Sequence, residues 1–347
     1  MQLEAARLDR ATAPMQVGLA SPFPHTGELQ AIVWADLLGE DFRPITRAAA
    51  MAIPAVARQR HILCGSVARN PLVPLQGSTP LTGDQFRWMT RGDGPLSPYH
   101  RMLWTVDDLI FHGWSLWSAT RGAAEAGMRP LLSTDRIPMD RWETDEVGRI
   151  KVDGELVTHG DEVILIPGPH EGILNFGASS LRRMVDNLEA AANAARNPSA
   201  YLELHYTGET PLTDTEVDKM IERWARARRG ENGGVSFTGR SIEVKEHGTH
   251  ESHLLIEGRN ADAVDASRLV SSPAAMADAT SAGASLTYET TSGRNQQMLD
   301  YGADFYMDAI AARLSMDDVV TRGNRVAFDT GDFTTPTPSA TGAPTDD

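Results

Sequence analysis

The chain has 347 residues, a length at which more than one domain is expected. Hydrophobic residues make up 41% of it and charged residues 23%, proportions typical of a globular protein. The net charge of −15 argues against a protein that grips nucleic acid through phosphates, because such proteins present a basic surface. It does not exclude a surface along which DNA slides without sticking.

Neither export nor membrane insertion is expected from the sequence. No apolar run approaches the roughly 20 residues that span a bilayer. The start, MQLEAARLDR, carries charges where an export signal needs an apolar core. The single cysteine, Cys64, excludes an internal disulfide framework, and its small or apolar neighbours predict a buried, inert thiol rather than a nucleophile.

The first third of the chain predicts an irregular arm followed by helices. Residues 1–29 contain prolines and no clear period, whereas residues 44–69 repeat apolar side chains at helical spacing, with Pro54 predicted to kink or divide the helix. A second helical stripe begins near Met102 and runs into strand-like residues. We interpret the tryptophans there as the core of a helix and strand rather than as an aromatic binding platform: Trp104, Trp114 and Trp117.

The middle of the chain predicts short strands. Asp153-Gly154 lies between two β-type runs, and Asp-Gly supplies the positive φ angles of a type I′ hairpin turn. The apolar run EVILI follows as a further strand, Glu162 to Ile166.

A glycine loop follows that strand and resembles a phosphate-binding loop in its spacing. Gly172, Gly177 and Ser179 satisfy G-x-x-x-x-G-x-[ST], but Ala178 occupies the position of the lysine that reaches the phosphates. We therefore interpret the loop as a sharp corner between a strand and a helix, with the glycines permitting a tight turn. A nucleotide-dependent enzyme remains the less favoured alternative.

Two helices, a strand and a hairpin are predicted next. The helix of residues 181–196 ends at Asn197-Pro198, and AYLELHY reads as a strand. A capping box, Thr213-x-x-Glu216, opens a helix that ends before Gly230. Its apolar residues predict one buried face: Val217, Met220, Ile221 and Trp224. A second hairpin is predicted to turn at Thr238-Gly239.

The last third predicts a helix at residues 251–270, a loop of small residues, a helix at 295–314 and a strand from Arg325. In the final helix, apolar side chains fall in line: Leu299, Ala303, Tyr306 and Ile310. The tail of residues 334–347 is low in complexity and predicted to be disordered.

Few residues suggest a metal, ligand-binding or catalytic site. The histidines of HGTHESH, namely His247, His250 and His253, have the spacing of zinc ligands, but they straddle a loop, so a solvated turn is favoured. Basic residues gather on the helix that follows Thr213, either as a solvated face or as a patch for an acidic partner or phosphate: Lys219, Arg223, Arg226, Arg228 and Arg229. No catalytic set stands out, so no enzyme, metal or cofactor is predicted.

Several stretches, taken in order, resemble the HK97-like portal proteins of tailed bacteriophages, as found in phages of actinobacteria. The matching stretches include SPYHRMLWTVDDLIFHGWSLW, RIPMDRWETDEVGRIKVDGELV, EVILIPGPHEGILNFG and LTDTEVDKMIERWARARRGENGGVSF. None is a tight signature alone, and their joint order is the specific feature. The resemblance covers residues from about Gln30 to Phe333.

The resemblance implies an α+β fold with a wing, a two-helix stem and a small α/β clip. A crown is expected to be short or absent, because only a short tail follows Phe333. The expected segments are an N-terminal arm (1–29), wing (30–178), stem helix (179–199), clip (200–247), stem helix (248–270), tunnel loop (271–293), wing helix with closing strand (294–333) and tail (334–347).

The resemblance also implies a ring, usually dodecameric, at one capsid vertex of the virion, assembled in the bacterial host cytoplasm. Double-stranded DNA enters and leaves through it without specific binding, past tunnel-loop residues: Thr280, Ser281, Gly283, Ser285 and Thr287. The expected partners are other copies of the chain, the terminase large subunit, the head–tail connector, and the major capsid and scaffold proteins, with no membrane. Another virion connector, such as an adaptor ring, is the alternative.

Overall fold

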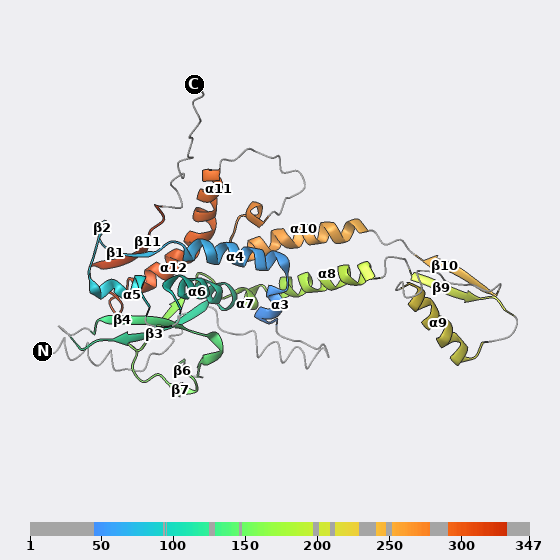
Figure 1. The fold of residues 1–347 in the computed structure, drawn as a ribbon, viewed down its shortest axis with the longest axis horizontal. Helices are drawn as coiled ribbons and strands as arrows, with labels where there is room; N and C mark the ends of the chain where they lie inside the picture. The colour runs from blue at the N-terminus through green and yellow to red at the C-terminus, as the bar shows by residue number, and fades with distance from the viewer. Residues whose placement is uncertain are drawn as a thin grey trace, which may run out of the picture. The chain divides into compact units, whose positions relative to one another are not determined.

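The structure, a computed structural model, describes residues 45–92, 94, 96–124, 129–145, 148–196, 201–208, 212–228, 241–247, 252–277 and 291–331. The chain divides into two units (Figure 1). The second unit is Arg183–Asp262, and the first unit contains the chain on either side of it. Helices and small antiparallel sheets make up both units, so the predicted α+β class is confirmed. Among the described helices, none has the length and apolar character to cross a membrane.

The helices of residues 47–68 and 98–112 follow the sequence prediction. The first apolar pattern forms α3 (Arg47–Met51) and α4 (Pro54–Ala68), and Pro54 divides them by occupying the first turn of α4. The Ser97 hydroxyl accepts from the backbone N–H of His100 at the start of α6 (Pro98–His112). Gly113 ends α6 with a φ of 79°, a left-handed conformation that favours glycine.

The main sheet of the first unit places β3 (Trp114–Arg121) between β4 (Leu131–Ile137) and β8 (Val163–Pro167). A second sheet has the order β5 (Trp142–Thr144), β6 (Ile150–Val152) and β7 (Glu155–Leu156). The predicted Asp-Gly hairpin joins β6 to β7, and both turn residues have positive φ angles, 52° and 84°.

A third sheet joins distant parts of the chain. The closing strand β11 (Asn324–Phe328) pairs with β1 (Leu72–Gln76), which also pairs with the two-residue β2 (Thr79–Pro80). Short helical segments complete this part of the first unit: η1 (Asp84–Phe86), α5 (Arg87–Thr90) and η2 (Met139–Arg141). The strand at the end of the chain was predicted, and its pairing partner was not.

The predicted final helix is interrupted. It consists of α11 (Thr291–Met298), the π-helix η4 (Leu299–Ala303) and α12 (Asp304–Leu314). The predicted apolar line is buried, with each member at most 4% exposed: Leu299, Ala303, Tyr306 and Ile310. In Figure 1, α6 lies between α4 and the strands β3 and β4, so helices and strands pack on opposite sides of α6.

Two long helices connect the units. The corner helix α7 (Ile173–Phe176) leads into α8 (Ala178–Arg196), and α10 (Ser252–Leu269) returns to η3 (Ala274–Ala277). Within the second unit, Asn187 Nδ2 donates to Asp262 Oδ2 at 2.8 Å, and Arg183 Nη2 lies 3.6 Å from Asp262 Oδ1. Polar side chains therefore hold α8 against α10.

The second unit also contains β9 (Tyr201–Tyr206), α9 (Asp214–Arg228) and β10 (Ile242–His247). The strands β9 and β10 pair antiparallel. One half of the predicted capping box forms, because Glu216 Oε2 accepts from the Thr213 N–H at 3.0 Å and from its hydroxyl at 2.8 Å. The Glu216 N–H donates instead to the backbone oxygen of Thr213 at 2.9 Å. The predicted buried face of α9 is wrong for Val217, which is 39% exposed, and for Ile221, which is 57% exposed. The other two members, Met220 and Trp224, are half-buried.

Candidate functional site

The glycine corner is built by close packing. Gly172 has a φ of 87°, and a Cβ there would lie 2.5 Å from Phe111 O and from His112 C. A Cβ on Gly177 would lie 2.9 Å from the Leu269 side chain. Both glycines therefore serve the approach of the corner to α6 and α10. This agrees with the structural interpretation of the loop, in which Ala178 opens α8 without offering a cation.

A histidine relay joins three segments at this corner. Gly172 N donates to His170 Nδ1 at 3.0 Å, which assigns the proton of the neutral ring to Nε2. Nε2 then donates to the Tyr306 hydroxyl at 2.9 Å, and that hydroxyl donates to Val270 O at 3.3 Å. Burial lowers the pKa of His170 to about 4 and raises that of the Tyr306 hydroxyl, so both groups are neutral near pH 7.

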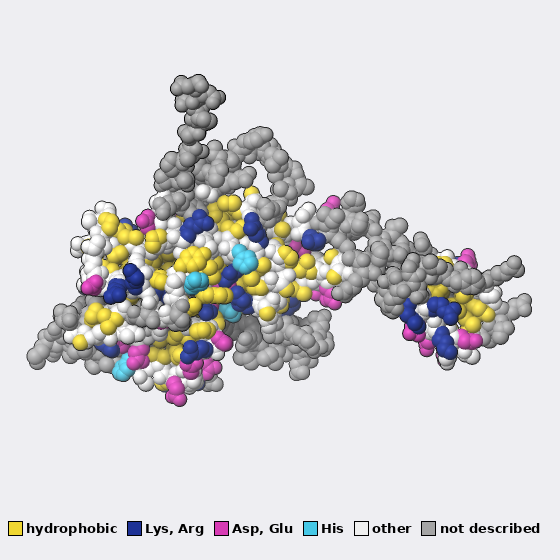
Figure 2. All heavy atoms as spheres, viewed as in Figure 1, with side chains coloured by type: hydrophobic (Ala, Val, Ile, Leu, Met, Phe, Trp, Pro, Cys, Tyr) yellow, Lys and Arg dark blue, Asp and Glu magenta, His cyan; other side chains and the backbone are white. Residues whose placement is uncertain are grey.

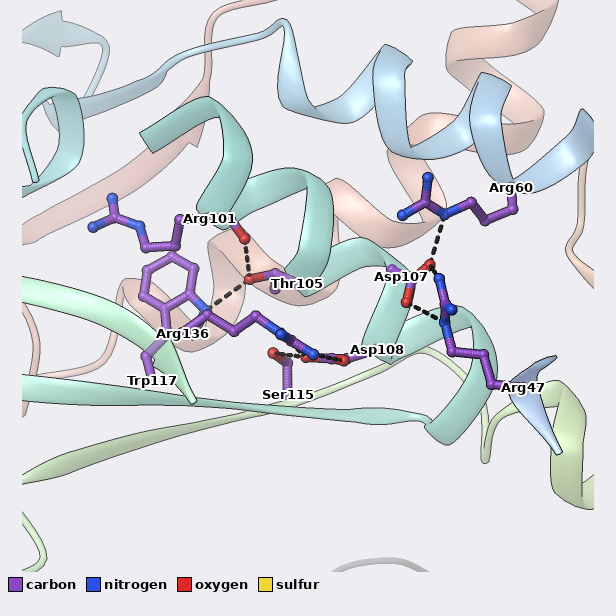
Figure 3. A network of polar contacts seen from close by, with 9 residues as sticks. All are labelled: Arg47, Arg60, Arg101, Thr105, Asp107, Asp108, Ser115, Trp117 and Arg136. Atoms are coloured by element: carbon purple, nitrogen blue, oxygen red, sulfur yellow. Dashed lines mark hydrogen bonds and ion pairs between the residues drawn. The ribbon is translucent and has the colours of Figure 1, made fainter. Parts of the chain in front are cut away.

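Two adjacent aspartates on α6 organise a buried polar network (Figure 3). Asp107 is 2% exposed; it accepts two hydrogen bonds of 2.8 Å from Arg47 and one of 2.6 Å from Arg60. Asp108 is 1% exposed; it accepts from Arg136 at 2.6 and 2.7 Å and from the Ser115 hydroxyl at 2.8 Å. The network thus joins α3, α4, β3 and β4 to α6.

The tryptophans of this region complete the same network. The guanidinium groups of Arg47, Arg60 and Arg136 lie 5.1 to 5.9 Å from the Trp104 ring centroid. Trp117 is fully buried and donates from Nε1 to the Thr105 hydroxyl at 2.7 Å. Their interpretation as core residues of a helix and strand is confirmed. The sequence prediction missed the network, although the Asp107-Asp108 pair within an apolar helix signalled buried charges that need partners.

Arg101 is a buried cation with neutral partners. Its Nη1 donates to Thr134 O and Oγ1, each at 2.6 Å, and its Nη2 donates to Trp88 O at 2.9 Å. Burial lowers its pKa to about 10, and burial raises the pKa of Asp108 despite the Arg136 guanidinium. Cys64 is buried, as predicted, and burial raises its pKa. These groups hold the core, and none is open to a ligand.

A pocket of about 410 Å³ lies between the end of α10 and the η4 region. Four of its seven lining residues carry a hydroxyl group, and its one cation, Arg268, is ion-paired with Asp265 at 2.9 Å. Its residues are Ser267, Arg268, Ser271, Ser272, Pro273, Gln297 and Tyr301. No nucleophile with an adjacent base lines it. Within the residues that the structure describes, no cluster of histidine, cysteine or acidic residues could hold a metal.

The predicted basic helix is exposed. Lys219, Arg223 and Arg226 all lie on the surface of α9, and Arg226 Nη2 is 3.2 Å from Glu222 Oε1. Figure 2 shows basic, acidic and hydrophobic side chains together over α9. Arg229, the predicted turn at Thr238-Gly239 and His250 lie outside the described residues, as does the side chain of Arg228. So do the predicted tunnel-loop residues Thr280, Ser281, Gly283, Ser285 and Thr287.

No protein-family model and no curated protein matches the chain, whereas solved structures do. An HK97 family phage portal protein from Corynebacterium diphtheriae has 35% sequence identity and a TM-score of 0.71, over 85% of this chain and 99% of that one. A protein in the neck of an empty GTA particle has 14% identity and a TM-score of 0.56, over 86% and 89%. One in the neck of a native GTA particle has 12% identity and a TM-score of 0.55, over 94% and 89%.

The two neck proteins share the fold at low identity, and the Corynebacterium protein shares much of the sequence as well. That similarity extends over nearly all of the known portal chain. It agrees with the resemblance of the ordered stretches described above. The chain therefore belongs to the HK97 family of phage portal proteins.

Proposed function

We propose that the chain is the portal subunit of a tailed-phage virion, and that its copies close into a dodecameric ring at one capsid vertex. The observation that carries this proposal is the 35% identity over 99% of the Corynebacterium portal chain. That coverage favours a portal over the alternative of an adaptor ring. A neck structure with this fold was computed with C12 symmetry, and we extend such a ring to this chain as part of the proposal.

The segments of the proposed ring are a wing (30–178, completed by 294–333), a stem (179–199 and 248–270), a clip (200–247) and a tunnel loop (271–293). Support comes from the order of elements: the clip lies between two long helices, α8 and α10. The arm (1–29) and the tail (334–347) complete this assignment.

The proposed channel passes DNA in both directions. A net charge of −15 suits this role, because each phosphate-binding cation would add affinity and therefore friction. We propose the small side chains of the tunnel loop, from Thr280 to Thr287, as the part nearest to the DNA. They offer hydroxyl groups and no cations in that span.

The proposed partners follow from the clip. The terminase large subunit docks there during packaging and the head–tail connector afterwards, with Arg223 and Arg226 meeting acidic surfaces. Capsid and scaffold proteins surround the wing during assembly in the bacterial cytoplasm. In this proposal the chain is a structural component, needs no cofactor, and leaves ATP hydrolysis to the terminase.

Mass measurement of the purified chain in solution, joined to electron microscopy of single particles, tests the ring. We expect a closed ring with a central opening and a mass close to a whole multiple of 37.7 kDa. A chain that remains monomeric at every concentration, and in the presence of its capsid and scaffold proteins, contradicts the proposal. Appreciable ATP turnover by the purified chain would instead support the nucleotide-dependent alternative.

A further inference from the structure

Exposed aromatic side chains gather beside the corner of the first unit. Phe176 is 47% exposed, Phe305 39% and Tyr301 71%. The His170 ring lies between two of them, with centroid distances of 5.3 Å to Phe176 and 6.1 Å to Phe305. Contiguous exposed apolar patches of this kind mark interaction surfaces.

Carboxylates flank these rings. Asp300, Asp304 and Asp308 recur at every fourth residue along η4 and α12, a spacing at which like charges repel. Burial, Asp308 and Asp300 together raise the pKa of Asp304. None of the three is ion-paired with another described residue. We call this the acidic–aromatic surface: Phe176, Asp300, Tyr301, Asp304, Phe305 and Asp308.

A second patch has the opposite charge. Leu96 is 42% exposed and Tyr99 is 43% exposed. Arg87 in α5 and Arg91 just after its C-terminal end are also exposed. The bond from Arg101 Nη2 to Trp88 O, at 2.9 Å, ties α5 to the first turn of α6, and the Tyr99 ring packs edge-on against His100. Neither Arg87 nor Arg91 is ion-paired within the described chain. We call this the basic–tyrosine surface: Arg87, Arg91, Leu96, Tyr99 and His100.

The two surfaces lie at opposite ends of one helix. The basic–tyrosine surface surrounds the start of α6, and Gly172, which precedes Phe176, packs against its end at Phe111 and His112. Figure 1 shows α5 and α7 on opposite sides of α6. A helix of 15 residues is roughly 22 Å long. Different, complementary surfaces on opposite sides of a subunit give a head-to-tail contact, which can close into a ring.

We propose that the acidic–aromatic surface of one copy binds the basic–tyrosine surface of the next copy. Charge complementarity selects this partner: guanidinium groups neutralise the aspartates and stack on the exposed rings, while Leu96 and Tyr99 bury the apolar area. This inference rests on the ring proposed above and names the surfaces that close it.

Charge reversal on each surface tests the pairing. One variant carries Asp300→Lys, Asp304→Lys and Asp308→Lys, and the other carries Arg87→Glu and Arg91→Glu. Each variant alone faces like charges across the contact, so we expect the subunit concentration for half-assembly to rise about tenfold or more. An equimolar mixture restores opposite charges at every contact of an alternating ring, so we expect it to assemble as the wild type does.

The matched control reverses three exposed carboxylates on and beside the β5-β6-β7 sheet: Asp140→Lys, Glu143→Lys and Glu155→Lys. We expect this control to assemble as the wild type does. Native mass spectrometry reports assembly, and thermal unfolding reports folding of each subunit. If the lysine variant does not fold, the Asp→Asn triple variant carries the test, again with weakened assembly expected.

Two results overturn the pairing and leave the ring proposal intact. One is a charge-reversed variant that folds and assembles with wild-type affinity, as expected if residues 1–44 or another virion protein cover the acidic–aromatic surface. The other is a mixture that assembles no better than either variant alone. A wild-type chain that forms no ring, even in the presence of its capsid and scaffold proteins, overturns the proposed function itself.

Discussion

At the residue scale, the buried arginines show why the tryptophan region is a core and not a binding platform. Each planar guanidinium group bonds to fixed acceptors and also stacks on an indole ring, as Arg101 does at 4.7 Å from the Trp117 centroid. Lysine offers a point charge and cannot replace both interactions. Removing Arg136 would leave the buried Asp108 carboxylate without its cation, at a cost of about 3–5 kcal/mol.

His170 predicts a pH dependence of stability. Its pKa is about 4 in the folded chain and 6.5 ordinarily, so the unfolded chain binds the extra proton first as the pH falls. Stability is therefore full above about pH 6.5 and declines as the pH falls toward 4, by about 3 kcal/mol for this group. We expect His170→Gln to flatten that decline in thermal unfolding measured across the range. Equal pH dependence in wild type and variant would show that His170 is not responsible.

At the element scale, local patterns predicted most helices and the Asp-Gly hairpin, because capping residues and spacing act over a few positions. The pairing of β1 with β11 escaped prediction, since nothing local specifies a partner so far along the chain. The π-helix escaped for a related reason: its buried line of side chains continues the helical pattern on both sides. On α9, the apolar spacing was recognised, and the single chain leaves Val217 and Ile221 exposed because burial there needs another surface.

The candidate sites also differ in how far the sequence could predict them. The glycine corner could be interpreted from sequence, because a missing lysine is a local fact. The acidic–aromatic surface could not, since it combines Phe176 with residues 300–308 from a distant part of the chain. The basic–tyrosine surface lies within residues 87–100, where no local pattern shows which side chains are exposed. The same holds for the His170 relay, which joins Gly172, Tyr306 and Val270.

The basic face of α9 predicts a partner-specific defect. We expect reversal of Arg223, Arg226 and Arg229 to glutamate to reduce DNA packaging or connector docking while the subunit still folds and forms rings. Packaged DNA per particle and thermal unfolding measure the two effects. The matched control reverses Arg129, Arg141 and Arg322, which lie in the first unit. Normal packaging by the α9 variant would mean that this face is only solvated.

At the scale of the whole molecule, the acidic net charge limits which contacts can hold copies of the chain together. A subunit with a net charge of −15 repels its neighbours at long range, so contacts between copies must combine apolar area with local opposite charges. The surfaces at the two ends of α6 have that combination. At a salt concentration of about 0.1 M, the repulsion between charges more than about 10 Å apart is largely screened. Pairs of charges in direct contact are screened less.

The same acidity predicts weak binding to DNA. We expect assembled rings to retain no duplex DNA in a gel-shift measurement at about 150 mM salt, because acidic residues outnumber basic ones and the net charge of −15 repels phosphate. A basic phage protein that binds DNA provides the positive control. Retention that falls steeply with added salt would show instead that cations line the channel.

The first and last residues of the second unit lie close together in space. The Arg183 and Asp262 side chains approach within 3.6 Å, although 78 residues separate them in the sequence. A segment whose two ends lie close together can be replaced by another segment without displacing the elements before and after it. Chimaeras that exchange Arg183–Asp262 between relatives therefore test whether this unit carries the proposed docking specificity.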